Sequence, residues 1–173
     1  FARRKKKKAD KKPEIVKEII EKDIIVDKYI NESNVYVIKN QNNNIISKTV
    51  KDVDLLNHDL MISNLKDTEV KITCTTTAVR IDHVENCKIY LGPCNGSIHI
   101  EHAKNCLFVF ASRQLRIHYC TDSLFYIFTK SKPIIEDTTR VQFAPYNLTY
   151  TNIIDDLKNV NMYQVENLYD QVQ

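Results

Sequence analysis

Alternating apolar and polar residues run along most of the chain after Asn34, and they recur as a repeat. Five segments of similar pattern start about 17 to 19 residues apart, at Leu60, Val79, Ile98, Leu115 and Pro133. Stacking the segments aligns a column of isoleucines: Ile62, Ile81, Ile100, Ile117 and Ile135. A second apolar column follows eight residues further on: Val70, Ile89, Phe108, Phe125 and Phe143. The chain is therefore built from one short repeated unit.

Two further columns indicate how each unit turns. A turn column lies between the apolar columns and is Asn or Asp until its last member: Asp67, Asn86, Asn105, Asp122 and Arg140. The next column holds small side chains: Thr68, Cys87, Cys106, Ser123 and Val141. A period this short leaves no room for helix pairs, so each unit is interpreted as one coil of a parallel β-helix, an all-β fold. A leucine-rich repeat is the main alternative, but its regular Leu and Asn spacing is absent.

The pattern divides the chain into three parts. Residues 1–33 are a basic, largely disordered segment, in which Pro13 and the isoleucines from Ile15 to Ile24 predict a short amphipathic helix. Residues 34–150 form the β-helix domain. Residues 151–173 form a C-terminal tail, whose apolar residues predict that it packs back across the coils as a cap.

Composition excludes several functions. With only two glycines, Gly92 and Gly96, the chain cannot form the glycine-rich loops of Rossmann or P-loop nucleotide sites, so we expect no bound cofactor. Five cysteines without a CxxC pair argue against a disulfide framework or a zinc ribbon, and Cys87 and Cys106 are predicted to be reduced core residues. No apolar run reaches the length of a membrane span. The basic segment is interpreted as a solvated run, so neither nucleic acid nor membrane is a predicted partner.

If the isoleucine column points inward, the residues on either side of it point outward. One outward column is Met61, Arg80, His99, Arg116 and Ile134, and the other is Ser63, Asp82, Glu101, His118 and Glu136. His83 and His102 should stack beside the acidic members of the second column, an arrangement that invites a metal site. Polar ladders more often simply face water, so the sequence predicts no metal. A hydrolytic carboxylate pair of Glu101 and Glu136 has no pocket signal to support it.

Several motifs, in a fixed order, resemble the C-terminal domain of the tubulin-folding cofactor C family. They are Gln114-Leu-Arg-Ile-His118, Pro133-Ile-Ile-Glu-Asp137 and Phe143-Ala-Pro-Tyr146, preceded by Leu55-Leu-Asn-His-Asp59, Ile62-Ser-Asn-Leu65 and Gly92-Pro-Cys-Asn-Gly-Ser97. The resemblance covers roughly residues 36–150. It implies a right-handed β-helix and a GTPase-activating role, in which the protein acts with cofactors D and E, stimulates GTP hydrolysis by β-tubulin and releases the native heterodimer. It also implies a cytoplasmic, cytoskeleton-associated protein that is not itself the hydrolysing enzyme.

The resemblance also assigns roles to individual residues. Arg116 corresponds to the arginine finger of the family, inserted in trans into the nucleotide site of the partner. Glu136 is expected to hold the guanidinium extended, and Gln114 to line the contact. The expected partner interface further includes Arg113, His118, Phe143, Pro145 and Tyr146. From the residues alone, Arg116 and Glu136 would be interpreted as an ordinary surface ion pair.

Two positions depart from the family pattern, and two other functions stay open. Arg113 stands where the family usually has a second glutamine, and Leu148 where it has an aromatic residue, which weakens the expected aromatic rim. A related domain uses the same arginine and glutamate to activate an Arf-like small GTPase, which is the first alternative. The second is a β-helical scaffold that binds cytoskeletal partners without catalysis.

Overall fold

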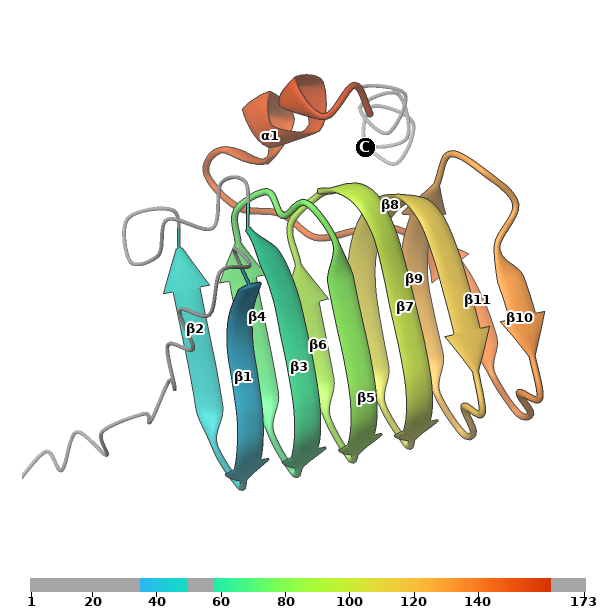
Figure 1. Ribbon diagram of the computed structural model, residues 1–173. Helices are drawn as coiled ribbons and strands as arrows, with labels where there is room; N and C mark the ends of the chain where they lie inside the picture. Colours follow the sequence, from blue (N-terminus) through green and yellow to red (C-terminus); the bar gives the residue numbers. More distant parts are fainter. Residues whose placement is uncertain (1–34, 50–57, 163–173) are drawn as a thin grey trace, which may run out of the picture.

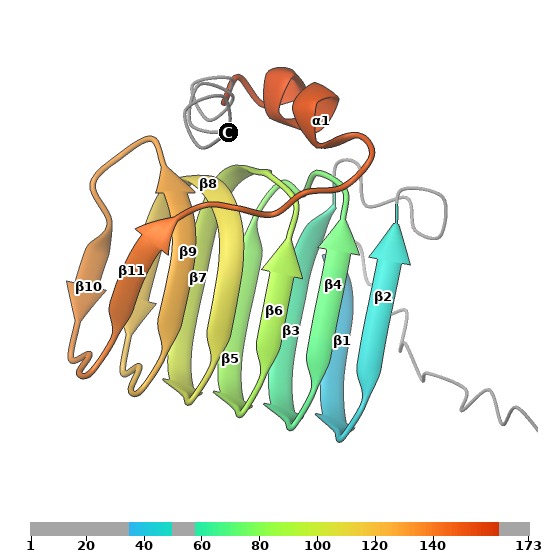
Figure 2. The same cartoon turned by 180° about the vertical axis from the view of Figure 1, so that it is seen from behind.

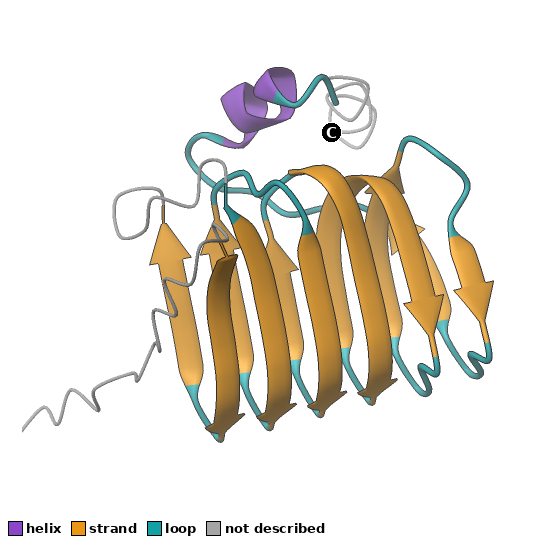
Figure 3. Cartoon of the chain, viewed as in Figure 1, coloured by secondary structure: helices purple, strands orange, loops and turns teal. Residues whose placement is uncertain are grey.

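The computed structural model describes residues 35–49 and 58–162, which form one stack of parallel β-coils (Figure 1). The strands are β1 (Val35–Asn42), β2 (Ile45–Thr49), β3 (Asp59–Lys66), β4 (Glu69–Thr73), β5 (Val79–Glu85), β6 (Lys88–Leu91), β7 (Cys94–Lys104), β8 (Leu107–His118), β9 (Leu124–Thr129), β10 (Ile134–Glu136) and β11 (Gln142–Pro145). Strands dominate the described residues, and a short helix, α1 (Ile153–Asn159), follows them (Figure 3). The basic segment and its expected helix lie outside the described residues.

The strands form two faces of the stack, and all pairing is parallel. One face runs β1, β3, β5 and β7 and continues into the C-terminal half of β8 and then β10. The other face runs β2, β4 and β6 and continues into the N-terminal half of β8, then β9 and β11. The long strand β8 therefore belongs to both faces (Figures 1 and 2). This topology confirms the predicted parallel β-helix.

Backbone register confirms both apolar columns. Ile62, Ile81 and Ile100 are paired on consecutive coils and are each 0% exposed. In the second column the Phe108 and Phe125 rings stack with their centroids 4.9 Å apart. Phe143 stacks on Phe125 at 5.2 Å. Burying each large apolar side chain contributes about 1.5–3 kcal/mol, and the chain can realise this gain only when the coils stack.

Each coil turns at residues with left-handed backbone conformation. The turn column has φ between 48° and 53° throughout, including at Arg140. Asn and Asp tolerate this conformation best among residues with a side chain, which explains their predominance there. The corner residues also bond to one another, since the Asn105 amide donates to Asn86 at 2.8 Å and the Asn86 amide donates to Asp67 at 2.9 Å. A second left-handed corner lies three residues earlier in the coils, for example at His83 and His102.

The small column lies at the following corner and is buried except at Val141, and its cysteines behave as predicted. Cys87 and Cys106 are reduced and buried, and the backbone N–H of Cys106 donates to the Ser123 hydroxyl at 3.1 Å. All five cysteines are free thiols. Bulky side chains would not fit here because the chain bends sharply against the next coil.

The described part of the C-terminal tail, up to Met162, packs across the side of the coils, and the remainder of the predicted cap lies outside the described residues. After β11 the chain crosses the outside of the β9, β8 and β6 face before it enters α1 (Figure 2). A second apolar cluster fastens it, consisting of Val109, Ala111, Tyr146, Leu148, Ile153, Leu157, Val160 and Met162. Gly92 lies beneath this crossing, where a Cβ would clash with the Cys74 carbonyl and the Tyr150 hydroxyl. The tail therefore covers the side of the stack.

Among the described residues, no further coil covers the outer side of the last coil. Ile135 and Phe143 are 42% and 45% exposed, although their columns are fully buried elsewhere. The reason is that the final coil has a neighbouring coil on one side only within the part of the chain that the structure describes. The strands β10 and β11 thus present apolar side chains that continue the two internal ladders.

We predict that Phe108→Ala destabilises the domain by about 3–5 kcal/mol, because it removes a ring packed between two coils. Phe143→Ala, in the same column but exposed on one side, is the matched control and should cost no more than about 2 kcal/mol. Urea unfolding followed by circular dichroism measures both. Equal losses for the two variants would show that the ladder does not carry the stability.

Candidate functional site

The residues flanking the isoleucine column form two ordered ladders on the outer face of β3, β5, β7, β8 and β10. Backbone register joins Arg80 to His99, His99 to Arg116, and Arg116 to Ile134. The second ladder contains Asp82, Glu101, His118 and Glu136. The register therefore confirms both outward columns predicted from the sequence, because all of their members occupy equivalent positions on successive coils.

Arg116 lies on β8 with its side chain exposed. It lines a pocket of about 410 Å³ together with Ser97, His99, Gln114, Ser131, Lys132 and Ile134. Within the described residues the Arg116 guanidinium has no hydrogen bond or ion pair. Arg80 differs, because its Nη2 lies 3.0 Å from the Glu101 carboxylate. Arg116 is thus a cation held on a rigid strand without an internal partner.

Glu136 does not contact Arg116 in this structure. The register pairs Glu136 with His118, and the residue opposite Arg116 is Ile134. Glu136 is exposed, and no hydrogen bond or ion pair joins it to Arg116 among the described residues. The orienting role of Glu136 stays a prediction for the complex with a partner.

His118, near the same end of the stack, contacts Asp137 and Tyr119. Its Nε2 lies 3.0 Å from the Asp137 carboxylate, and its ring stacks on Tyr119 with centroids 3.7 Å apart. Gln114 is exposed and borders the Arg116 pocket. The predicted site residues Gln114, Arg116 and His118 are therefore alternate residues on the same face of β8.

Arg113 has a structural role that the sequence did not reveal. Its Nε donates to the Asn95 side chain at 3.0 Å, and its Nη2 donates to the Val160 carbonyl at 3.2 Å. Arg113 thereby ties the residue that follows α1 to the start of strand β7. The expected partner contact of Arg113 would compete with this clamp.

The expected apolar rim is smaller than predicted. Phe143 and Pro145 are exposed on β11, whereas Tyr146 is 2% exposed and belongs to the tail cluster. Tyr146 therefore does not contribute an exposed aromatic surface, because the tail folds over it. Leu148 is buried in the same cluster, so its departure from the family pattern concerns tail packing and not an exposed rim.

Pocket residues in loops were missed by the sequence analysis. Ser131 and Lys132 lie between β9 and β10 and line the Arg116 pocket. The repeat alignment could not find them, because this loop falls outside the aligned columns. The only available signal was their position directly before the Pro133-Ile-Ile-Glu-Asp137 motif.

A buried polar pair lies between the tail and α1. The Tyr150 hydroxyl donates to the Asp156 carboxylate at 2.6 Å. Burial raises the pKa of the Asp156 carboxyl, and the hydrogen bond from Tyr150 only partly opposes this effect. Burial, with a smaller contribution from Asp156, also raises the pKa of the Cys74 thiol to about 12. Cys74 is therefore a protonated core residue.

The fold and this face define a class: a short parallel β-helix with polar ladders on one face and a tail fastened along its side. Residues 57–173 match the family model described as tubulin binding cofactor C, and the chain belongs to this family. It is 40% identical over 114 residues to the tubulin-folding cofactor C of Arabidopsis thaliana, covering 66% of this chain and 33% of the relative.

Two tubulin-specific chaperones C are also similar. The protein of Dictyostelium discoideum is 46% identical over 91 residues, covering 51% of this chain and 22% of the relative. The protein of Mus musculus is 30% identical over 119 residues, covering 69% of this chain and 35% of the relative. The chain therefore spans about a third or less of the length of these relatives. No described helix is long and apolar enough to cross a membrane.

We predict that Arg113→Ala loosens the end of the tail. Losing two hydrogen bonds from a charged donor should cost roughly 1.5 kcal/mol and speed exchange of the Asn161 and Met162 amides about tenfold. Hydrogen exchange read by mass spectrometry measures this change. Arg140→Ala removes an exposed arginine bonded to Asp122 on another corner and should leave these amides unchanged. Unchanged exchange in Arg113→Ala would contradict the clamp.

We predict that Asp156→Asn becomes increasingly stabilising relative to wild type as pH rises above the ordinary pKa of an aspartate, about 4. A carboxyl whose pKa is raised by folding stabilises the protein most below its unfolded pKa and loses that contribution as pH rises through the folded value. Asparagine keeps an acceptor for Tyr150 without the charge. Thermal unfolding against pH, relative to wild type, measures the difference. Glu136→Gln, which removes an exposed carboxylate on β10, is the control, and parallel curves for the two variants would exclude burial as the cause.

Proposed function

We propose that this domain acts in tubulin folding as a GTPase-activating domain, which supplies Arg116 in trans to β-tubulin with bound GTP in a complex with cofactors D and E. Family membership supports the tubulin-folding part of this proposal. The observation that carries the finger is the exposed, internally unpaired guanidinium of Arg116 beside a pocket, within the described residues. On this proposal the protein activates the partner enzyme and performs no hydrolysis itself.

The chemistry requires a group with the properties of arginine. As the γ-phosphate leaves, negative charge spreads over the transferring oxygens, and a guanidinium delivered in trans stabilises that charge. Such a finger accelerates hydrolysis by about 10³- to 10⁵-fold, equivalent to about 4–7 kcal/mol. Lysine presents a single ammonium point charge in place of the planar fork, so it would replace arginine poorly.

The surroundings of Arg116 favour its delivery to a partner. A guanidinium in an internal ion pair, such as that of Arg80 with Glu101, would first have to give up its carboxylate. Arg116 has no such bond to break within the described residues, and its backbone is fixed between β7 and β10. We infer that Glu136 orients the guanidinium only when the partner closes over this face. Gln114 lines the contact in the same way.

The exposed side chains near the open end supply the remaining contact surface. Phe143 and Pro145 on β11 offer apolar area, and exposed aromatic residues anchor many protein interfaces. His118 lies two residues beyond Arg116 on the same face of β8. A partner that receives Arg116 would therefore cover the last two coils. The proposed cellular site is the cytoplasm, in association with the cytoskeleton.

We predict that Arg116→Ala removes stimulated GTP hydrolysis, lowering the stimulated rate by about 10³-fold or more towards that of tubulin alone. The assay contains tubulin, cofactors D and E, and the full chain, and measures phosphate release. Arg80→Ala is the matched control, because it removes an arginine from the same outward column, two coils away. Arg116→Lys should restore little of the activity.

The outcomes distinguish the other functions. Full stimulation by Arg116→Ala would exclude the finger and leave a chaperone or scaffold that acts by binding alone. Equal loss in Arg80→Ala and Arg116→Ala would indicate damage to the whole face. Stimulation of an Arf-like small GTPase but not of tubulin would assign the same arginine to the alternative partner.

A further inference from the structure

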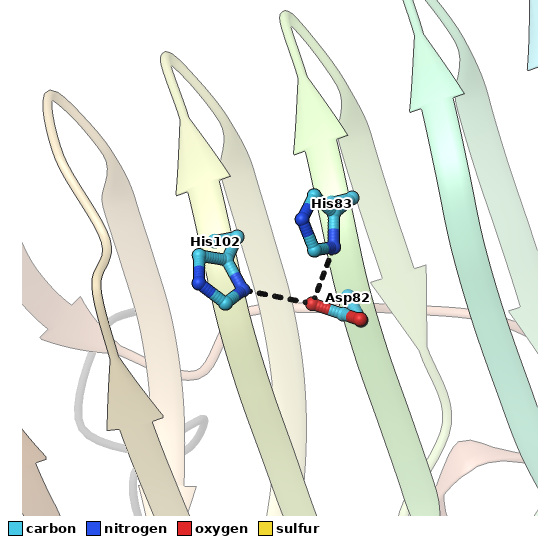
Figure 4. A group of neighbouring side chains, drawn as sticks. All are labelled: Asp82, His83 and His102. Atoms are coloured by element: carbon cyan, nitrogen blue, oxygen red, sulfur yellow. Dashed lines mark hydrogen bonds and ion pairs between the residues drawn. The ribbon is translucent and has the colours of Figure 1, made fainter.

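Three side chains of the types that ligate metals meet on the outer face of β5 and β7, and none of them lines the Arg116 pocket. Asp82 and His83 are consecutive residues near the end of β5, and His102 lies one coil further on, in β7. Figure 4 shows both imidazoles directed at the same carboxylate. The donor atoms of the three residues all lie within 4.8 Å of one another.

The convergence results from the corner conformation of the backbone. In a regular strand, the consecutive residues Asp82 and His83 would point to opposite faces. His83 instead has φ of 52°, in the left-handed region, so that both side chains are directed outward. His102 has φ of 50° at the equivalent corner of the next coil. The same corner one coil earlier holds Asn64, and histidine, like asparagine, is enriched in this conformation.

The distances are close to those of a coordination shell. The Nδ1 atoms of His83 and His102 lie 2.8 Å and 3.0 Å from the same Asp82 oxygen. The two rings stack with centroids 4.4 Å apart and planes 25° apart. Ligand atoms about 2.0–2.1 Å from a tetrahedral zinc ion are roughly 3.3 Å apart, so small side-chain rotations would bring these three atoms into that arrangement.

The side chains have room for this adjustment. They are 24% exposed for Asp82, 59% for His83 and 45% for His102, and they pack on the surface rather than in the core. When a metal binds, the Asp82 carboxylate would rotate so that its oxygen faces the ion and no longer the two imidazole N–H groups. Each imidazole would then carry its proton on Nε2 instead of Nδ1. The other histidine–carboxylate contacts of this face are different, because each involves one histidine: His99 contacts Glu101, and His118 contacts Asp137.

We propose that Asp82, His83 and His102 bind one divalent transition-metal ion of the zinc class on this face, with water completing the coordination. Two imidazole nitrogens and one carboxylate suit Zn²⁺, whereas Mg²⁺ and Ca²⁺ prefer oxygen ligands alone. Three protein ligands leave at least one position open to solvent. The site is independent of the proposed function, because none of its residues lines the Arg116 pocket.

The test is a calorimetric titration of the full reduced chain with Zn²⁺ alone, in a buffer that does not bind zinc. We expect one equivalent to bind. His102→Gln and Asp82→Asn should each weaken binding by at least about 10-fold, since even the residues that orient metal ligands typically contribute that much. His118→Gln is the matched control, a histidine of the same face with its own carboxylate, and should bind as wild type does.

A second measurement separates this site from the five cysteines. Co²⁺ in place of Zn²⁺ should give the visible absorption of a site with nitrogen and oxygen ligands, without the intense near-ultraviolet bands of thiolate ligation. Thiolate bands, an isotherm that is equal for wild type and His102→Gln, or the absence of any binding would each overturn the proposal. Circular dichroism should confirm that each variant remains folded, as expected for substitutions at the surface.

Discussion

Every coil of this domain can bury its apolar side chains only against the same positions of the neighbouring coils. The parallel register fixes that correspondence, so Ile81 lies between Ile62 and Ile100, and Phe125 stacks on Phe108. A shift of one residue would turn each ladder to the wrong face. The left-handed corners keep the register by giving every coil the same path, at the cost of a backbone conformation that most residues avoid.

The same register determines which surface residues are paired and which are available. Along one outward ladder, Arg80 and His99 both meet the carboxylate of Glu101 from the second ladder. Arg116 follows on the next coil, and the residue beyond it in its own ladder is Ile134. Arg116 would otherwise form an ordinary surface ion pair, but its guanidinium has no carboxylate partner among the described residues. Its availability is a property of its neighbours in the stack and cannot be inferred from the arginine alone.

The tail determines which of the residues that follow the last strand are buried. Tyr146 and Leu148 come directly after β11 and were expected near an exposed rim, but the chain turns back over the coils and buries both. Arg113 secures the far end of this crossing, and Gly92 leaves space beneath it. The tail therefore covers apolar surface on the side of the stack, whereas Phe143 and Pro145 on the last coil stay exposed.

The repeat in the sequence was sufficient to determine the coils, the two buried columns, the outward ladders and the Asn and Asp corners, because residues in a solenoid contact the same positions one period away. The burial of Tyr146, the clamp by Arg113 and the lack of contact between Glu136 and Arg116 depended on tertiary structure. The tail crosses several coils at once, and no periodicity describes a segment outside the repeat. The sequence predicted that His83 and His102 stack beside Asp82, and they do. That both imidazoles bond to the same carboxylate oxygen was decided in three dimensions, because a left-handed corner directs two consecutive side chains to one side.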